Sequence, residues 1–453
     1  MMFITLGVAV NWIEAQLKFK PKSDLDRMQA AYQMLDIHLD DIKKIHVAGT
    51  NGKGSVCSYL THVLMEAGYH VGTYTSPYLL KFNERLRYDF IDIEDQDLLE
   101  SINFIYDFNE YFLKTFGETL SFFELLTLMS MRYFEMKQVD VIVMEVGLGG
   151  LLDATNVLNY DLSLICSIGF DHMRQLGNTL ESIAYNKLGI LKPGNHLITT
   201  VDPTLHPFFE AHVSKVGATA NYYTEKDVMK ISDLPLSFVV DDIIYTLSMI
   251  GDFQLLNALL AIQAIRYLLP NLEPSIIQKG LKKAIWPGRL DRVKEKNIYI
   301  DGAHNTHAIQ ALEKTSKSLF KHQKIWVLFS ALGDKDIVGM LEIISGFAER
   351  ITLTSFPDFR FQPLEGYETK HIPYIEGALV AMEKLEKEMD DIIDIIADAQ
   401  QDDGYLYVSH ICKIANPREM GETPYSWVVH SHELYNLGHM YEGAIAYYRA
   451  TGK

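Results

Sequence analysis

The stretch "HVAGTNGKGS", residues 46–55, decides the fold of this chain, because it combines three glycines with one lysine and ends in a hydroxyl residue. The preceding run "IKKIHVAG", residues 42–49, predicts a short buried parallel strand that ends at Gly49. The following run, residues 55–68, places apolar side chains at helical spacing and ends at Gly68. A strand, a glycine-rich turn and a helix start together form a cradle for anions, because free backbone N–H groups and the helix dipole favour phosphate oxygens.

This loop departs from the common P-loop motif at two positions. Val47 stands where the first glycine of the motif is expected, and Gly54 lies between the lysine and the serine. Lys53 still supplies a point charge for phosphate, and Ser55 can reach a bound Mg²⁺. The alternative is a glycine-rich turn without a ligand. The strand before the loop and the helix after it favour the phosphate-binding interpretation.

The composition indicates a globular protein of two or three domains, since the chain has 453 residues and 48% apolar residues. Its formal net charge of −18 argues against a nucleic-acid partner. Three scattered cysteines, Cys57, Cys166 and Cys412, provide neither a disulfide framework nor the spacing of a metal knuckle.

The apolar start "MMFITLGVAVNWIEAQ" predicts a packed helix, because it lacks the basic region and the small-residue cleavage site of a signal peptide. No apolar run reaches the length needed to span a membrane. We therefore expect a cytoplasmic protein without a membrane partner, and a monomer.

Strand-like runs alternate with amphipathic stretches from residue 45 to about residue 292. The predicted strands are "KIHVAG" (44–49), "HVGTYTSP" (70–77), "DVIVMEVG" (140–147), "LSLICSIG" (162–169) and "HLITTV" (196–201). A hairpin is predicted over residues 236–251, and helices over 253–269 and 274–284. This alternation is typical of a doubly wound α/β fold with a largely parallel sheet.

A second, smaller α/β unit begins at "NIYIDGAHN", residues 297–305. It repeats the pattern with predicted strands at 324–332 and 350–356 and predicted helices at 337–347 and around 374–391. From about residue 392 onward the alternation stops, and tyrosine, histidine and aspartate become more frequent.

Polar residues follow several of the predicted strands, at the edge where open α/β sheets bind ligands. Ser76 follows one strand, Glu145 ends another, and Asp171 and His172 follow a third. Lys187 precedes an apolar turn. Each residue alone has an ordinary explanation: a loop serine, a salt-bridged glutamate, a capping aspartate or a surface lysine. Their common placement beside a phosphate loop favours a joint functional site.

The chain resembles the folylpolyglutamate synthase/dihydrofolate synthase family, within the wider group of ATP-dependent Mur ligases. The matching motifs are "HVAGTNGKGS", "TYTSPYLLKFNER", "VIVMEVGLGGLLDATN", "FDHMRQLGNTLESIAYNKLGILKPG", "GDFQLLNALLAI", "WPGRLD" and "DGAHN". They occur in the order of the family and cover roughly residues 10 to 390. The resemblance implies a P-loop-type doubly wound sheet, the Mur ligase central domain, followed by a smaller C-terminal α/β domain.

The resemblance also implies a reaction and its participants. ATP phosphorylates a carboxylate of folate or dihydropteroate, and the amine of L-glutamate then attacks the acyl phosphate to form an amide. Carried over by position, the nucleotide-binding residues are Gly49, Thr50, Asn51, Gly52, Lys53, Gly54, Ser55, Asn257, Arg289 and Asp301. The Mg²⁺ ligands are Ser76, Glu145 and His172, and the catalytic residues are Lys53, Lys187 and His304.

Lys187 matches a lysine of the family that becomes carbamylated. Because a plain ammonium group would repel Mg²⁺, the conversion to an anion has a physical reason. Thr306 stands where the family usually has proline after "DGAHN", which leaves the polar residues of the motif intact. Phe122, Phe123 and Glu124 are weaker candidates for the substrate side, since such residues at helical spacing more often belong to a core.

The C-terminal domain departs from the family pattern, because the chain lacks the usual last strand and its "GSLY"-like turn. The tail resembles a fragment of β-L-arabinofuranosidase-type glycoside hydrolases. It lacks their cysteine–glutamate zinc site, so we expect no arabinofuranosidase activity. The predicted organisation is an ATP-binding domain at 1–292, a truncated C-terminal domain at 293–391 and a non-catalytic, mostly helical tail at 392–453.

Two alternatives to a folate ligase stay open at this point. The truncated second domain is compatible with an inactive nucleotide-binding protein, and the ATP motifs are compatible with another Mur-type amino-acid ligase. The stretch "TSPYLLKFNER", residues 75–85, favours folate. The sequence does not separate dihydropteroate from tetrahydrofolate as the acceptor.

Overall fold

The computed structural model describes residues 3–18, 24–293, 297–333, 335–355, 364–367 and 372–376, with residues 381, 384, 385 and 387. The chain divides into two compact units. The first comprises Met1–Arg289 and Asn305–Lys321, and the second comprises Leu290–His304 and His322–Lys453. The chain therefore passes between the units three times. The predicted helical tail from residue 392 lies outside the described residues.

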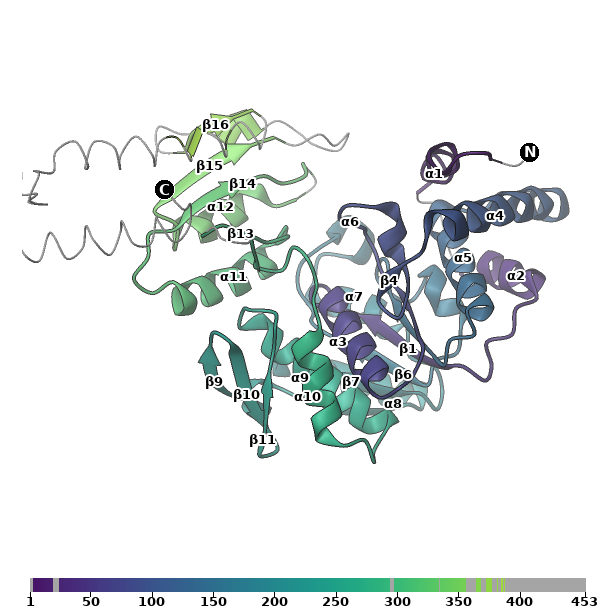
Figure 1. Cartoon of the computed structure of the whole chain (residues 1–453), viewed down its shortest axis with the longest axis horizontal. Helices are drawn as coiled ribbons and strands as arrows, with labels where there is room; N and C mark the ends of the chain where they lie inside the picture. Colours follow the sequence, from purple (N-terminus) through teal and green to yellow (C-terminus); the bar gives the residue numbers. More distant parts are fainter. Residues whose placement is uncertain are drawn as a thin grey trace, which may run out of the picture. The chain divides into compact units, whose positions relative to one another are not determined.

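The first unit is built on an eight-stranded sheet with the order β4-β3-β2-β5-β1-β6-β7-β8 (Figure 1). The strands are β1 (Lys43–Ala48), β2 (Val71–Tyr74), β3 (Leu86–Tyr88), β4 (Ile91–Asp92), β5 (Val141–Glu145), β6 (Leu162–Ile165), β7 (His196–Thr199) and β8 (Thr219–Tyr222). All pairings are parallel except two at one end of the sheet, where β3 pairs antiparallel with both β2 and β4. This confirms the doubly wound α/β fold.

The strand order changes direction at β1, which pairs with β5 on one side and with β6 on the other. In open α/β sheets, ligands bind outside the carboxyl ends of the strands at such a switch point. The loop after β1 is the glycine-rich stretch, so the topology places it at the switch point.

Both faces of the sheet are buried, and successive residues of a strand face opposite sides of it. Ile45 and Val47 of β1, with Val143 of β5, belong to one core, together with helices α3, α9 and α10. Ile142 and Met144 of β5 belong to a second core, with α1, α2, α4 and α5. Continuous apolar strands are expected when helices cover both faces of a parallel sheet.

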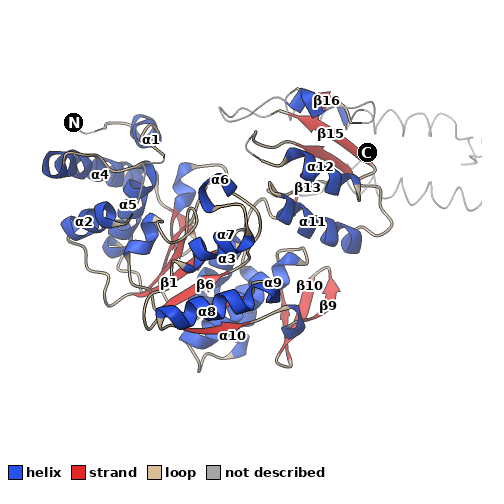
Figure 2. Ribbon diagram, turned by 180° about the vertical axis from the view of Figure 1, so that it is seen from behind, coloured by secondary structure: helices blue, strands red, loops and turns tan. Residues whose placement is uncertain are grey.

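Most helices of the first unit cover the two faces of this sheet, whereas α11 contacts α9 (Figures 1 and 2). The helices of this unit are α1 (Leu6–Glu14), α2 (Asp26–Leu35), α3 (Lys53–Glu66), α4 (Asp95–Phe116), α5 (Phe122–Met136), α6 (Met173–Leu176), α7 (Leu180–Leu188), α8 (His206–Val216), α9 (Phe253–Leu268), α10 (Pro274–Lys283) and α11 (Thr306–Leu319). The predicted N-terminal helix is α1, and the two helices predicted after the hairpin are α9 and α10. The long helix α4 was not predicted from the sequence.

A small antiparallel sheet, β11-β10-β9, packs its inner side on the core of α9 and α10. Its strands are β9 (Met229–Asp233), β10 (Leu236–Val240) and β11 (Ile243–Thr246). The pair β10–β11 is the predicted hairpin, and β9 is an additional strand that the sequence analysis missed.

In its described residues, the second unit contains two short sheets. One pairs β12 (Asp291–Arg292) with β13 (Tyr299–Ile300), and the other has the order β14 (Trp326–Phe329), β15 (Arg350–Thr354), β16 (Tyr374–Ile375). Helix α12 (Ile337–Ser345) connects β14 to the parallel strand β15. Tyr374 and Ile375 were expected to begin a helix, but they pair with β15, because their backbone groups complete its free edge.

Within the described residues, none of the helices combines the length and the apolar character that crossing a membrane requires.

Candidate active site

The glycine-rich loop after β1 has the backbone geometry of a close-approach turn. Gly52 has a φ of 92°, and a Cβ at this position would collide with the side chain of Asn257. A Cβ at Gly49 would lie 3.0 Å from the Cβ of Cys166. Only glycine fits at Gly52 without strain, and helix α3 starts directly after it. The loop thus leaves backbone N–H groups at a helix N-terminus, the arrangement that binds phosphate.

Two lysines converge on this loop. The Nζ of Lys53 donates to the carbonyl oxygens of Gly49 at 3.1 Å and Thr50 at 3.4 Å. The Nζ of Lys187, a buried residue near the end of α7, donates to the same oxygen of Gly49 at 2.8 Å. Burial, together with the charge of Lys53, lowers the pKa of Lys187 to about 7. A neutral amine is therefore well populated on Lys187 near neutral pH.

Glu145 ends β5 and is buried, with 4% of its surface exposed. Its Oε2 accepts a hydrogen bond from the backbone N–H of Ser76 at 2.9 Å, and its Oε1 lies 3.9 Å from the Nζ of Lys53. Burial raises the pKa of Glu145, while the charge of Lys53 opposes this. The structure therefore brings together two predicted metal ligands, Ser76 and Glu145, next to the lysine of the phosphate loop.

The residues present fit a hard cation with ATP. The carboxylate of Glu145 and the hydroxyl of Ser76 are oxygen donors of the kind that Mg²⁺ prefers. Within the described part of the chain, no three His, Cys, Asp or Glu side chains form a cluster that could hold a metal ion.

His172, the third predicted metal ligand, lies in the left-handed backbone region with a φ of 49°. Its Nε2 is 3.9 Å from Oδ2 of Asp171, and its side chain is 43% exposed. Asp171 in turn accepts a hydrogen bond from the Nδ2 of Asn305 at 3.0 Å.

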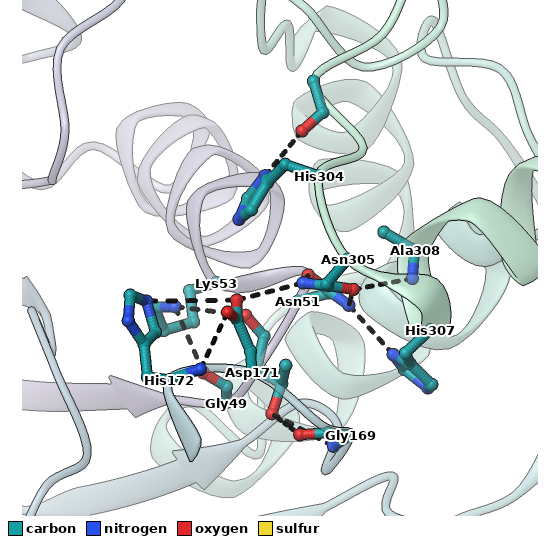
Figure 3. Close-up of polar contacts among 12 residues, drawn as sticks. Gly49, Asn51, Lys53, Gly169, Asp171, His172, His304, Asn305, His307 and Ala308 are labelled. Atoms are coloured by element: carbon teal, nitrogen blue, oxygen red, sulfur yellow. Dashed lines mark hydrogen bonds and ion pairs between the residues drawn. The ribbon is translucent and has the colours of Figure 1, made fainter. Parts of the chain in front are cut away.

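A reciprocal amide pair ties the phosphate loop to the start of α11 (Figure 3). The Nδ2 of Asn51 donates to the Oδ1 of Asn305, and the Nδ2 of Asn305 donates to the Oδ1 of Asn51, both at 3.1 Å. The same Oδ1 of Asn305 caps α11 by accepting from the N–H of Ala308 at 2.8 Å. Asn51 also donates to the Nδ1 of His307 at 2.9 Å.

Sequence reasoning missed the connecting roles of Asn305 and His307. Asn305 did carry a clue, because an asparagine directly before an amphipathic run is a preferred helix cap. His307 carried none. Thr306, which replaces the usual proline, is the first residue of α11, where proline is favoured but not required.

Asn257 lies on α9 and faces the phosphate loop. Its Nδ2 donates to the Oε1 of Gln254 at 3.1 Å, and the Nε2 of Gln254 donates to the Oγ of Ser55 at 3.3 Å. Arg289 is the last residue of its segment of the first unit, and its charge lowers the pKa of Glu145.

Asp301 and His304 belong to the second unit. Asp301 accepts hydrogen bonds from the backbone N–H groups of Leu290 and Ala303, both at 2.8 Å. The Nδ1 of His304 donates to the carbonyl oxygen of Gly302 at 2.7 Å (Figure 3). Because a carbonyl oxygen can only accept, this bond places a proton on Nδ1.

Glu124, one of the weaker substrate-side candidates, has a structural explanation. Its Oε2 accepts from the N–H of Ser121 at 2.8 Å and from its Oγ at 2.7 Å, which caps α5. It also pairs with Arg27 at 3.0 Å. The ring of Phe123 instead packs over Gly147, where a Cβ would collide with it.

Comparisons with known proteins agree with this geometry. Residues 47–265 match the family model "Mur ligase middle domain", and residues 288–410 match "Mur ligase, glutamate ligase domain". Residues 378–453 match "Beta-L-arabinofuranosidase, GH127 catalytic domain", which agrees with the resemblance of the tail.

Several curated relatives are similar over most of their length. The dihydrofolate synthase/folylpolyglutamate synthase of Bacillus subtilis (strain 168) is 38% identical over 372 residues, which cover 78% of this chain and 86% of the relative. The folylpolyglutamate synthase of Lacticaseibacillus casei is 35% identical, covering 72% of this chain and 80% of the relative.

Solved structures show the same fold. The "FPGS-AMPPCP-folate complex" has a TM-score of 0.73 at 28% identity and covers 85% of this chain and 100% of its own. A bifunctional folylpolyglutamate synthase/dihydrofolate synthase with Mn, AMPPNP and L-glutamate bound has a TM-score of 0.72 at 27% identity, covering 84% and 92%. With the motifs in order and the phosphate loop at the switch point of the sheet, this chain belongs to the folylpolyglutamate synthase/dihydrofolate synthase family.

Proposed function

We propose that this chain is an ATP-dependent ligase that joins L-glutamate to a carboxylate of a folate or dihydropteroate acceptor. The observation that carries the proposal is the convergence of Lys53, Lys187 and Glu145 on the glycine loop at the switch point of the sheet. Relatives of known structure bind AMPPCP with folate, or AMPPNP with Mn and L-glutamate. ATP and a divalent cation, Mg²⁺, are the expected cofactors.

The reaction has two steps. A carboxylate oxygen of the acceptor attacks the γ-phosphorus of ATP, which gives an acyl phosphate and releases ADP. The neutral amine of glutamate then attacks the acyl carbon, loses a proton and expels phosphate as the amide forms. The protein contributes mainly positioning and cationic groups, because little covalent chemistry falls to its side chains in phosphoryl transfer.

Each residue of the phosphate loop has a proposed part in holding ATP. The backbone N–H groups from Gly52 to Gly54 would bind the phosphates, because Thr50 and Asn51 donate theirs to Ser167. Lys53 would neutralise charge on the transferred phosphoryl group. The hydroxyl of Ser55 would supply an oxygen ligand for the cation. As the family resemblance implies, Asn257, Arg289 and Asp301 are proposed to contact the nucleotide, and His304 is proposed to act in catalysis.

Ser76, Glu145 and His172 are the proposed ligands of Mg²⁺. When bound, this cation supplies charge stabilisation to the phosphate oxygens. Glu145 is buried at 4% exposure, a costly position for a carboxylate unless a cation accompanies it. Its contact with the N–H of Ser76 holds both ligands in one place.

Lys187 is proposed to be carbamylated. Its free amine, populated because burial lowers the pKa to about 7, adds to CO₂ and releases a proton, and the resulting carbamate is an anion. This change removes a buried positive charge beside Lys53 and supplies an anion near the cation site.

The test is release of ADP by the full chain with ATP, Mg²⁺ and glutamate, offered dihydropteroate and tetrahydrofolate in separate reactions. ADP release that requires both glutamate and one pterin supports the proposal. No release with either acceptor overturns it and leaves a nucleotide-binding protein without ligase activity. Release with an amino acid and a cell-wall precursor instead would identify another Mur-type ligase.

Other features of the chain stay predictions. These are the division at residues 292 and 391, the non-catalytic role of the tail, the cytoplasmic location and the monomeric state. Sedimentation of the purified full chain would test the last of them.

A further inference from the structure

Arg85 is a buried cation in an aromatic setting. It is the last residue of the 3₁₀ turn η1 (Phe82–Arg85) and is 7% exposed. Its guanidinium carbon lies over three rings, at 4.9 Å from the centre of Tyr78 and at 5.4 Å from those of Phe82 and Phe122. Such contacts attract a cation to the ring faces. They provide no hydrogen-bond acceptor for the N–H groups, which point outward in the plane of the guanidinium.

This guanidinium has no acceptor in the described part of the chain. None of its N–H groups makes a hydrogen bond there, no carboxylate lies within ion-pair distance, and its Nε is sealed from solvent. Burial lowers the pKa of Arg85, but an arginine stays charged at any pH at which proteins fold. A buried charge without a partner is unfavourable, which indicates that a ligand supplies the missing anion.

Arg87, two residues further along, shows how the same segment satisfies an arginine with a structural role. Arg87 is equally buried, at 6% exposure. Its Nε donates to Asp92 at 2.7 Å, its Nη1 donates to the Oγ1 of Thr75 at 3.4 Å, and its Nη2 lies 3.8 Å from Glu84. The carboxylates of Glu84 and Asp92 lie in the same segment and contact Arg87, but neither contacts Arg85.

The backbone anchors Arg85 next to the cation site. The carbonyl oxygen of Arg85 accepts a hydrogen bond from the N–H of Thr75 at 3.0 Å. Ser76, which follows Thr75 in the chain, donates its backbone N–H to Glu145. The charge of Arg85 also lowers the pKa of Glu145, although the two groups form no ion pair. An anion bound by Arg85 would therefore lie close to Ser76 and Glu145.

We propose that Arg85 binds the acceptor carboxylate that receives the phosphoryl group. The inference rests on the proposed function, because it assigns a residue to the acceptor in that reaction. A planar guanidinium matches a carboxylate with paired hydrogen bonds, and it offsets the repulsion between that carboxylate and the γ-phosphate. Lys53 and the glycine-rich loop are already proposed to bind the ATP phosphates, so Arg85 is left for a different anion. The rings around Arg85 suit the aromatic end of a pteroate-type acceptor.

The test compares Arg85→Met with the matched control Arg87→Met in the full chain. For Arg85→Met, we expect the KM for the acceptor to rise by about ten- to a hundred-fold, with the KM values for ATP and glutamate within about two-fold. Arg85→Lys should recover only part of this loss, since an ammonium group lacks the planar pair of donors. For Arg87→Met, the acceptor KM should stay within about two-fold of the wild type.

Melting temperatures separate binding from a structural role. Without ligand, Arg85→Met should melt at the same or a higher temperature than the wild type, because an unpaired buried charge is removed. Arg87→Met should melt lower, because Asp92 and Glu84 lose their partner. The stabilisation that dihydropteroate or tetrahydrofolate gives without ATP should be present in the wild type and lost in Arg85→Met.

Three results would overturn the inference: an unchanged acceptor KM and thermal shift in Arg85→Met, a rise in the KM for glutamate instead, or a lower melting temperature in Arg85→Met than in Arg87→Met. An inactive wild type would reject the proposed ligase function. The ATP-independent thermal shift would still decide whether Arg85 binds the acceptor.

Discussion

The ammonium groups of Lys53 and Lys187 lie 3.1 Å and 2.8 Å from one atom, the carbonyl oxygen of Gly49. Two positive charges that share one acceptor repel each other, and Lys187 is buried. The repulsion between the two ammonium groups disappears when Lys187 loses its charge. It would turn into attraction if Lys187 became an anion. The phosphate loop and Lys187 are therefore parts of one electrostatic unit.

Lys187→Ala should lower ligase turnover by at least about a hundred-fold, because the anion beside the cation site is lost. Intact-mass measurement with bicarbonate should show a carbamate in the wild type and none in the variant, and acetate should restore part of the activity. Lys192→Ala is the control, since Lys192 donates to the carbonyl oxygen of Leu158 and has no part in the site. Full activity of Lys187→Ala would exclude the proposed role.

Lys53→Ala should reduce turnover by about a thousand-fold, because the cation that meets the transferred phosphoryl group is removed. The melting temperature should stay close to that of the wild type, since the Lys53 side chain is partly open to solvent, donates to two loop carbonyls and approaches Glu145 only at 3.9 Å. Steady-state ADP release and thermal melting check the two halves of this prediction. A variant with wild-type turnover would show that the loop does not position the nucleotide.

Gly54, the residue that separates this loop from the common motif, is buried against the indole of Trp286. A methyl group at Gly54 would overlap that ring, so Gly54→Ala should lower the free energy of unfolding by about 1–3 kcal/mol. Combining it with Trp286→Leu should cost less than the sum of the two single changes, as a double-mutant cycle in urea would measure. Strict additivity would mean that the two residues do not constrain each other.

His46 should make the stability of the first unit depend on pH. It is fully buried, its Nε2 bonds to the Oγ1 of Thr155 at 2.8 Å, and burial lowers its pKa to about 3. Its pKa in the unfolded chain is about 6.5, so the unfolded state takes up the proton first as the pH falls. The stabilisation is complete above about pH 6.5, and about 2 kcal/mol of it is lost by pH 5.

Urea unfolding at pH 8 and pH 5 measures this loss. His46→Gln is the matched variant, because a glutamine can still donate to Thr155 but does not titrate in this range. It should be less stable overall and show a smaller difference between the two pH values. Equal pH dependence in both proteins would assign the effect to other groups.

The strands and the phosphate loop could be predicted from the sequence because their determinants are local. An apolar run, a glycine and a helix start lie within twenty residues around Lys53, so their pattern survives without knowledge of partners. The pair of Asn51 and Asn305 could not be predicted in this way, since 254 residues separate the two amides. The strand at Tyr374 was missed for the same reason, because only its pairing with β15 defines it.

The different settings of Arg85 and Arg87 show where sequence reasoning ends. Both lie in one polar run, and nothing in "FNERLRYD" says which of them finds a carboxylate. That difference arises from the packing of η1 against α5 and from the antiparallel turn to β4, which brings Asp92 to Arg87. Candidate residues could be named from motifs, but their partners required the three-dimensional structure.

Helix α11 follows strands of the second unit in sequence, yet it belongs to the first unit. Its Asn305 holds the phosphate loop, and its Thr315 accepts a hydrogen bond from the N–H of Asp252 at 3.0 Å. A recombination event or an engineered chimera that replaced everything after residue 292 with another domain would also remove α11. The first unit would then lose the contacts that Asn305 and Thr315 make with it. A functional exchange of the second unit would therefore have to keep α11 with the first.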